Sequence, residues 1–166
     1  TIMNALDIIS QIDSIYVRYN IPKNLQQHMK LTAAIAELIC NQWTGPEIDQ
    51  NNIIAALLVH DLANIIKFDL DSPEGLKILG SDRKRLPELK LLQQEYQKNY
   101  GEDDHQATLK ILQELKIEKS IIKLVNEHLL PNAVNILKSA DINLKIALYA
   151  DLRVNPTGVV MLKERF

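Results

Sequence analysis

Apolar residues recur at spacings of three and four along most of the chain, which is the period of an α-helix with one face in a core. Glycine is scarce, with five in 166 residues, and the alternation typical of strands is nearly absent. Residues 68–86 are charged and irregular, so we expect no long helix there. The pattern predicts helices over about 3–19, 22–42, 50–67, 87–99, 104–116, 118–129 and 133–152. This is the layout of an all-α, single-domain helical bundle covering residues 1–166.

Four of the predicted helices show a clear inward face. On these faces polar residues stand among apolar ones, and a buried polar group is costly without a partner. The expected core-facing positions are Met3, Leu6, Ile9, Ile12 and Tyr16; Leu25, His28, Thr32, Ile35 and Ile39; Ile53, Leu57, His60 and Asn64; and Leu137, Ala140, Leu144, Ala147 and Asp151.

Composition narrows the class of protein without naming a function. The chain is 46% hydrophobic and 24% charged with a net charge of −2, which gives no reason to expect a nucleic-acid polymer or an anionic membrane as partner. A single cysteine excludes an intramolecular disulfide and favours a reducing compartment. No apolar run reaches the ~20 residues that a membrane-spanning helix needs. We therefore expect a cytoplasmic protein, and nothing in the sequence indicates its oligomeric state.

The four histidines of the chain, together with two aspartates, form a candidate metal site. One histidine and one aspartate are adjacent, as His60-Asp61, inside an apolar run. Any one of these residues could instead be a hydrogen-bonded core histidine or a helix cap, but the whole set on separate helices indicates a shared ion. Nitrogen and oxygen donors without thiolate suit Fe, Mn, Co, Ni or Zn, and six donors are enough for two ions that share a carboxylate. The set is His28, His60, Asp61, His105, His128 and Asp151.

This ordered set resembles the HD superfamily, whose metal-dependent phosphohydrolases are named for the histidine–aspartate doublet. The stretch 104–112, DHQATLKIL, is similar to the helix that supplies a second-metal histidine in binuclear members. The stretch 150–154, ADLRV, is similar to the last ligand helix of the family, and the resemblance runs from about residue 22 to 160. It implies a helical bundle with a buried metal site.

The resemblance also implies which residues hold the ions. His28, His60, Asp61 and Asp151 would bind one ion, and Asp61 would bridge to a second ion bound by His105 and His128. The expected activity is hydrolysis of a small phosphorylated substrate, a nucleotide or another phosphate ester, by a metal-activated water. Asp61 is then the catalytic residue, because it positions that water as the shared ligand.

The sequence departs from the family pattern where substrate phosphate would bind. Many members have a Gly-Lys pair after the doublet, whereas this chain has Ala63-Asn64. The candidate substrate-binding residues are therefore Asn64, Lys67 one turn later, and Arg153 beside the last ligand; a solvated lysine or a surface salt bridge would explain the last two equally simply. The Gly-Tyr-Pro signature of cyclic-dinucleotide hydrolases is absent, so that activity is not expected.

Two other functions stay open at this point. Some relatives of the fold use the same ligand order to hold two irons that activate O₂, so an HD-type diiron oxygenase is one alternative. A non-catalytic domain that binds a nucleotide as a signal is another, and the missing Gly-Lys pair favours it. A purely structural bundle would have neither metal nor ligand.

Overall fold

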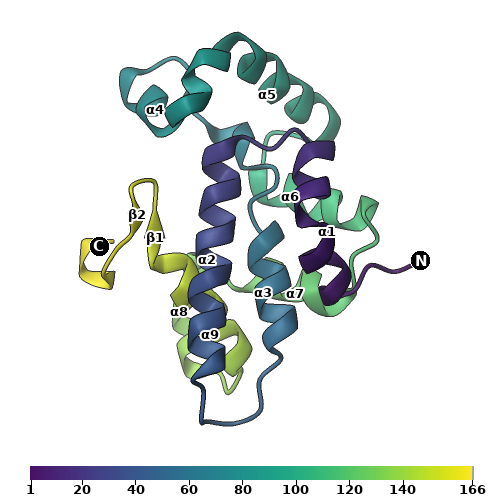
Figure 1. Cartoon of the computed structure of the whole chain (residues 1–166), viewed down its shortest axis with the longest axis vertical. Helices are drawn as coiled ribbons and strands as arrows, with labels where there is room; N and C mark the ends of the chain where they lie inside the picture. The colour runs from purple at the N-terminus through teal and green to yellow at the C-terminus, as the bar shows by residue number, and fades with distance from the viewer. Residues whose placement is uncertain (166) are drawn as a thin grey trace.

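Nine α-helices and one short hairpin make up residues 1–165, the part of the chain that this computed structural model describes (Figure 1). The all-α prediction is confirmed. No helix within this range is both long and apolar enough to cross a membrane. The helices are α1 Ala5–Arg18, α2 Lys23–Asn41, α3 Gln50–Val59, α4 Pro73–Ile78, α5 Leu86–Tyr100, α6 Asp104–Glu114, α7 Lys119–Glu127, α8 Ala133–Lys138 and α9 Ile142–Leu152. Four 3₁₀ turns lie between or after them: η1 Asn64–Lys67, η2 Gly80–Arg85, η3 Leu130–Asn132 and η4 Leu162–Glu164.

Helix α3 is the centre of the bundle. It contacts α1, α2, α7 and α9, and its residues Ile53 and Leu57 are fully buried. The Tyr16 hydroxyl of α1 donates a hydrogen bond of 2.7 Å to the Leu58 carbonyl, which fixes α1 against it. A helix surrounded in this way is apolar on nearly every face, and this explains the run IIAALLV that precedes the His60-Asp61 doublet.

Two of the predicted helices are shorter than the periodicity indicates. The helix expected over 50–67 ends at Val59, and the chain continues through a turn into η1. The helix expected over 133–152 is broken into α8 and α9, because Ser139 is extended and Asp141 caps α9 by accepting a hydrogen bond from the Leu144 N–H. The irregular segment 68–86 contains the short helix α4 and the turn η2.

Three expected core positions are wrong: Leu6, Leu137 and Ala140 are exposed, and Ala140 lies at the break between α8 and α9. Leu6 is 62% exposed, because α1 buries the neighbouring row that contains Ile8 and Ile15. Leu137 is 68% exposed, because the break at Ser139 turns α8 away from the direction of α9. The periodicity thus correctly predicted a helix at Leu6 and at Leu137, but it did not correctly predict which face of α1 or α8 is buried.

The turn η2 is tied to the start of α2 by a buried carboxylate. Pro22 precedes α2 and offers no side-chain acceptor for the free N–H groups of the first turn. Asp82, whose side chain is 3% exposed, accepts a hydrogen bond of 2.6 Å from the Lys23 N–H instead. The segment around η2 is thereby held beside α2, where it forms one wall of a cavity.

A two-stranded hairpin follows α9. Strand β1 (Val154–Asn155) pairs antiparallel with β2 (Gly158–Val159), with Val154 opposite Val159. Figure 1 shows the hairpin extending beside α2, on the same side of the molecule as α4. Its turn contributes to the opposite wall of the cavity.

Candidate metal centre

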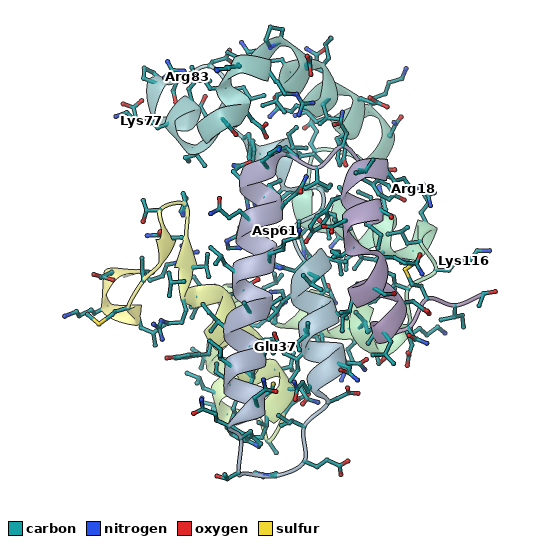
Figure 2. The ribbon with its side chains drawn as sticks, in the orientation of Figure 1. Arg18, Glu37, Asp61, Lys77, Arg83 and Lys116 are labelled. Atoms are coloured by element: carbon teal, nitrogen blue, oxygen red, sulfur yellow. The ribbon has the colours of Figure 1, made fainter. Side chains whose placement is uncertain are left out.

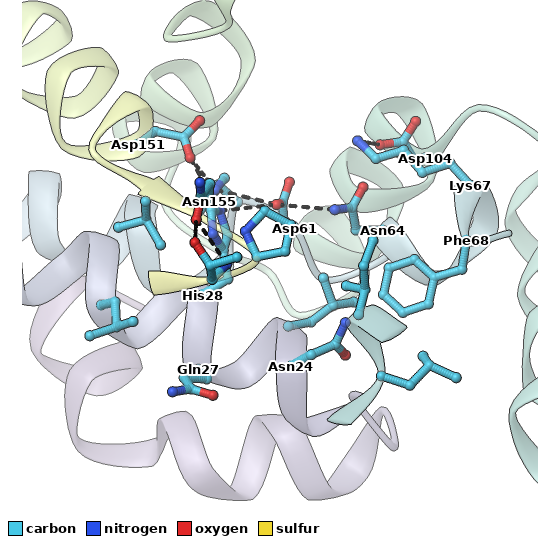
Figure 3. A pocket seen from close by; sticks show the side chains of 18 of the residues that line it. Asn24, Gln27, His28, Asp61, Asn64, Lys67, Phe68, Asp104, Asp151 and Asn155 are labelled. Atoms are coloured by element: carbon cyan, nitrogen blue, oxygen red, sulfur yellow. Dashed lines mark hydrogen bonds and ion pairs between the residues drawn. The ribbon is translucent and has the colours of Figure 1, made fainter. Parts of the chain in front are cut away.

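Five of the six expected ligands converge at the inner ends of four helices. His28 lies in the second turn of α2, His60 and Asp61 follow the last residue of α3, His128 follows α7, and Asp151 lies in the last turn of α9. Figure 3 shows His28, Asp61 and Asp151 gathered in this way, and in Figure 2 Asp61 lies in the middle of the molecule. We call these five residues the His/Asp cluster.

The donor atoms of the cluster are spaced as ligands of a common ion would be. Two atoms each ~2.1 Å from one ion lie roughly 3.0 Å apart at a right angle and roughly 3.6 Å apart at about 120°. Every short imidazole-to-carboxylate distance in the cluster falls in that range. From His28 Nε2 the distances are 3.5 Å to Asp61 Oδ2 and 3.2 Å to Asp151 Oδ1; from His60 Nε2 they are 3.5 Å and 3.3 Å to the same two atoms; and from His128 Nε2 to Asp151 Oδ2 it is 3.6 Å.

Backbone carbonyls orient two of the imidazoles. His60 Nδ1 lies 2.7 Å from the Leu57 carbonyl, and His128 Nδ1 lies 3.0 Å from the carbonyls of Leu124 and Val125. A carbonyl only accepts, so each Nδ1 carries the proton and, in the neutral ring, each Nε2 presents a lone pair. Both Nε2 atoms are buried without a hydrogen-bond partner. This is the arrangement of metal-binding histidines, in which the remote nitrogen is held by a backbone acceptor.

The charges of the cluster also call for a cation. Burial lowers the pKa of His60, but the carboxylates of Asp61 and Asp151 outweigh it and raise that pKa to about 9. Burial raises the pKa of Asp151, but the positive charge of His60 and the three imidazoles around the carboxylate hold that pKa well below its ordinary value. Without a metal, the cluster therefore keeps a proton at neutral pH. A divalent ion would take over that role, and the residues present fit one.

The His60-Asp61 turn is held in place by the helix α6. Because α3 ends at Val59, the Ala63 N–H has no helical acceptor, and it donates to Thr108 Oγ1 at 3.1 Å. Ala63 and Thr108 are both buried. Thr108 lies in the stretch DHQATLKIL singled out in the sequence, but no sequence signal assigned it this contact.

Asn64 positions the carboxylate of the doublet. Its side-chain amide donates to Asp61 Oδ2 at 3.2 Å, the same oxygen that faces His28 and His60 (Figure 3). The Asn64 carbonyl oxygen is buried without a partner. Asn64 therefore acts on the cluster itself, in addition to lining the cavity beside it.

The sixth expected ligand lies elsewhere. His105 is the second residue of α6, and its Nε2 lies 3.0 Å from Asn126 Oδ1. It lines the cavity but is in neither group of donor atoms close enough to share an ion; these groups are His28 with His60 and Asp61, and His60 with His128 and Asp151. The expected pairing of His105 with His128 is not the one observed, because His128 lies with Asp151. Metal binding by His105 stays a prediction.

A cavity of about 1030 Å³ opens from the cluster toward the surface. Of the three expected substrate-binding residues, Asn64 and Lys67 line it, and Lys67 is paired with Asp104 at 3.0 Å (Figure 3). Arg153 is not among the lining residues. Its guanidinium stacks over the Tyr149 ring, 5.6 Å from the centroid, and donates to the Tyr149 hydroxyl and to the Val160 carbonyl.

The rest of the cavity wall was not predicted. It includes Asn24 on α2, Phe68 after η1 and Lys77 on α4. These residues have no distinctive spacing in the sequence, and two of them lie in or next to the segment that periodicity left without structure. Only the capped start of α4, with Ser72 accepting from the Gly75 N–H and Pro73 in the first turn, could have indicated a helix there.

Comparison with known proteins gives one family. The family model for the HD domain matches residues 25–152, which include all six predicted metal ligands. The cavity-lining residues Lys23 and Asn24 and those of the hairpin lie outside the match. No curated protein and no solved structure matches the chain significantly.

Proposed function

The chain belongs to the HD domain family, whose members are typically metal-dependent phosphohydrolases, and we propose that it hydrolyses a small phosphate ester. A nucleotide is the substrate class we favour. One observation carries the proposal: buried, oriented imidazole nitrogens and two carboxylates converge at the inner end of a cavity large enough for such a molecule.

His28, His60, Asp61 and Asp151 would hold the ion. A divalent ion lowers the pKa of a water from about 15.7 towards about 7 and offsets charge on phosphoryl oxygens. The protein keeps the ligands in place: Leu57 holds the His60 ring through its carbonyl, and Asn64 holds Asp61 Oδ2. Because Asp61 is exposed to the cavity on its other side, its free oxygen can orient a water against the substrate.

The cavity wall favours an anionic substrate with a sizeable organic part. Ligand pockets usually measure about 300–1,000 Å³, so this one accommodates more than a bare phosphate. Lys23 and Lys77 line it and make no ion pair within residues 1–165, which leaves their charge available to an anion. Apolar side chains cover much of the rest, among them Leu31, Phe68 and Leu130, and the Phe68 ring offers a flat face to a planar group.

The test is phosphate release by protein loaded separately with Mn²⁺, Fe²⁺, Co²⁺, Ni²⁺ or Zn²⁺. The panel comprises nucleoside mono- and triphosphates, sugar phosphates and an aryl phosphate, and Asp61→Ala is the matched inactive variant. We expect release by the wild type with at least one metal, and a lower KM for nucleotides than for sugar phosphates. Tight nucleotide binding with no release under any metal would refute hydrolysis and indicate a sensing domain.

A further inference from the structure

Two asparagine side chains on the cavity wall each leave a buried acceptor without a partner. Within residues 1–165, the side-chain polar atoms that are buried and make no hydrogen bond are Nε2 of His60 and His128 and Oδ1 of Asn24 and Asn64. The two imidazole nitrogens belong to the His/Asp cluster, whereas both asparagines line the cavity beside it. Buried polar groups are nearly always paired in folded proteins. Unpaired amide oxygens on a cavity wall therefore indicate a ligand that carries hydrogen-bond donors.

Asn24 lies one helical turn from a proposed metal ligand. It is the second residue of α2 and precedes His28 by four residues, so the two side chains share a face and lie about 6 Å apart along the helix axis. Figure 3 shows Asn24 on the side of the cavity that also carries Asn64 and Phe68, with Gln27 apart from them. A group bound at Asn24 would therefore be a neighbour of a phosphoryl group held at the cluster.

The Asn24 amide can offer a ligand a donor and an acceptor side by side. The amide group is planar, and rotation about χ2 is soft, so the oxygen can turn toward the cavity with the nitrogen beside it. An asparagine amide in this orientation pairs with the edge of a heterocyclic base that presents an N–H next to an acceptor, as it does with adenine. Asn64 cannot turn in this way, because its nitrogen donates to Asp61 Oδ2. It can offer a ligand only its oxygen.

Phe68 supplies a flat apolar surface on the same side of the cavity. It follows η1, and its carbonyl accepts a hydrogen bond of 2.8 Å from Gln93 Nε2 of α5, which holds this part of the chain in place. The ring is partly buried against the core and lines the cavity. An aromatic face and an amide edge together suit a planar heterocycle. They suit a sugar ring less well, because its hydroxyl groups point in several directions.

We propose that Asn24 and Phe68 form a subsite for the nucleobase of the substrate, and that Asn24 is its specificity-determining residue. The base stacks on the Phe68 ring, and its N–H and acceptor pair with the Asn24 amide. This inference deepens the proposed function, and it rests on that proposal in taking a nucleotide as the substrate.

The experiment measures binding, by isothermal titration calorimetry on Zn²⁺-loaded protein, so that the result does not depend on turnover. The probes are phosphonate analogues of the four nucleoside monophosphates and of ribose 5-phosphate, in which a C–P bond replaces the ester bond. We expect the wild type to bind at least one nucleotide analogue roughly 10-fold or more tightly than the ribose analogue, as stacking and two hydrogen bonds would give.

Asn24→Leu and Phe68→Leu should each reduce this preference to about a fifth or less, because each removes one part of the subsite. Gln27→Leu is the matched control. Gln27 is another amide of α2 that lines the cavity, and its replacement should leave the preference unchanged. A wild type that binds the ribose analogue as tightly as every nucleotide analogue, or an unchanged preference in Asn24→Leu, would overturn the inference.

Urea unfolding of the same proteins supplies a readout that a structural role of Asn24 would not give. Leucine fills a similar volume and replaces an unpaired buried oxygen with an apolar group, so the unfolding midpoint of Asn24→Leu should be unchanged or higher. A clearly lower midpoint would show that Asn24 stabilises the fold, and it would overturn the assignment of Asn24 to substrate binding.

These outcomes separate the inference from the proposed function. A preference for nucleotides that depends on Asn24, in a protein that releases no phosphate with any metal, supports the inference and refutes hydrolysis. Phosphate release without a preference for nucleotides over sugar phosphates refutes the inference and supports hydrolysis. A protein with neither property refutes both.

Discussion

Replacement of Thr108 by valine tests whether the His60-Asp61 turn depends on the single hydrogen bond that Ala63 donates to α6. Thr108 is 1% exposed and Ala63 is 0% exposed, so no water can replace the Thr108 hydroxyl as acceptor for the Ala63 N–H. Valine has nearly the same shape as threonine but no acceptor. The variant therefore leaves one buried backbone N–H unsatisfied and creates no large cavity.

An orphaned buried donor costs about 1–3 kcal/mol, so Thr108→Val should lower the free energy of unfolding by about 2 kcal/mol. With a urea m-value of about 2 kcal/mol/M for a domain of this size, the unfolding midpoint should fall by about 1 M. The turn carries two of the proposed ligands, so the affinity for Zn²⁺ should fall as well.

The assay is urea unfolding followed by circular dichroism on chelator-treated protein, with Zn²⁺ affinity measured separately. Thr108→Ser is the matched control, because it keeps the hydroxyl and loses one methyl group, a cost of about 1 kcal/mol. It should retain wild-type Zn²⁺ affinity. A Thr108→Val protein within about 0.5 kcal/mol of wild type, with unchanged Zn²⁺ affinity, would refute the reasoning.

Three more predictions concern the pH dependence of the metal-free cluster, the Asp82 cap of α2, and Asp61. Metal-free protein should lose stability as pH rises from 6.5 through about 9, because the folded state holds the His60 proton more tightly than the unfolded state; it should also lose stability as pH falls below 3.8, because the Asp151 pKa is lowered by folding. Urea unfolding across the pH range checks both limbs, and a flat profile contradicts them. Asp82→Ala should lower the free energy of unfolding by about 0.5–2 kcal/mol, as for loss of an N-cap, and Asp82→Asn, which keeps an acceptor, should cost less by the same measurement. Asp61→Ala should abolish metal retention and phosphate release together; a full metal content by plasma mass spectrometry would contradict its assignment as a ligand.

Helical periodicity predicted the elements well where a helix has one buried face and ends in a recognisable cap. The predicted limits at 99 and 104 lie within two residues of Gly101 and Asp103, which cap the end of α5 and the start of α6 in the structure. The break between α8 and α9 was missed because Leu137, Ala140 and Leu144 continue the period across it. Asp141, an N-cap residue, was the available signal.

The site residues that could be predicted are those whose side-chain chemistry is unusual for their place in the sequence. His60 and Asp61 are conspicuous because polar groups interrupt the most apolar stretch of the chain. The location of the His105 side chain could not be predicted in this way. It depends on how the start of α6 is rotated relative to α7, and the residue pattern of a single helix gives no information on that rotation. Arg153 follows a ligand in sequence, but α9 ends there, and its side chain turns toward Tyr149.

The positions of two proposed ligands at helix ends would connect metal binding to folding. His60 and His128 both occupy the C-cap of their helices, where carbonyls of the last turn lie close to Nδ1 and leave Nε2 for an ion. An ion bound by residues of α2, α3, α7 and α9 exists only in the folded protein, so its binding energy adds to stability; at 100 times the dissociation constant the gain is about 2.7 kcal/mol. This is the size of the cost expected for Thr108→Val. The hydrogen bond from the Ala63 N–H to Thr108 and the ion would thus stabilise the same turn by comparable amounts.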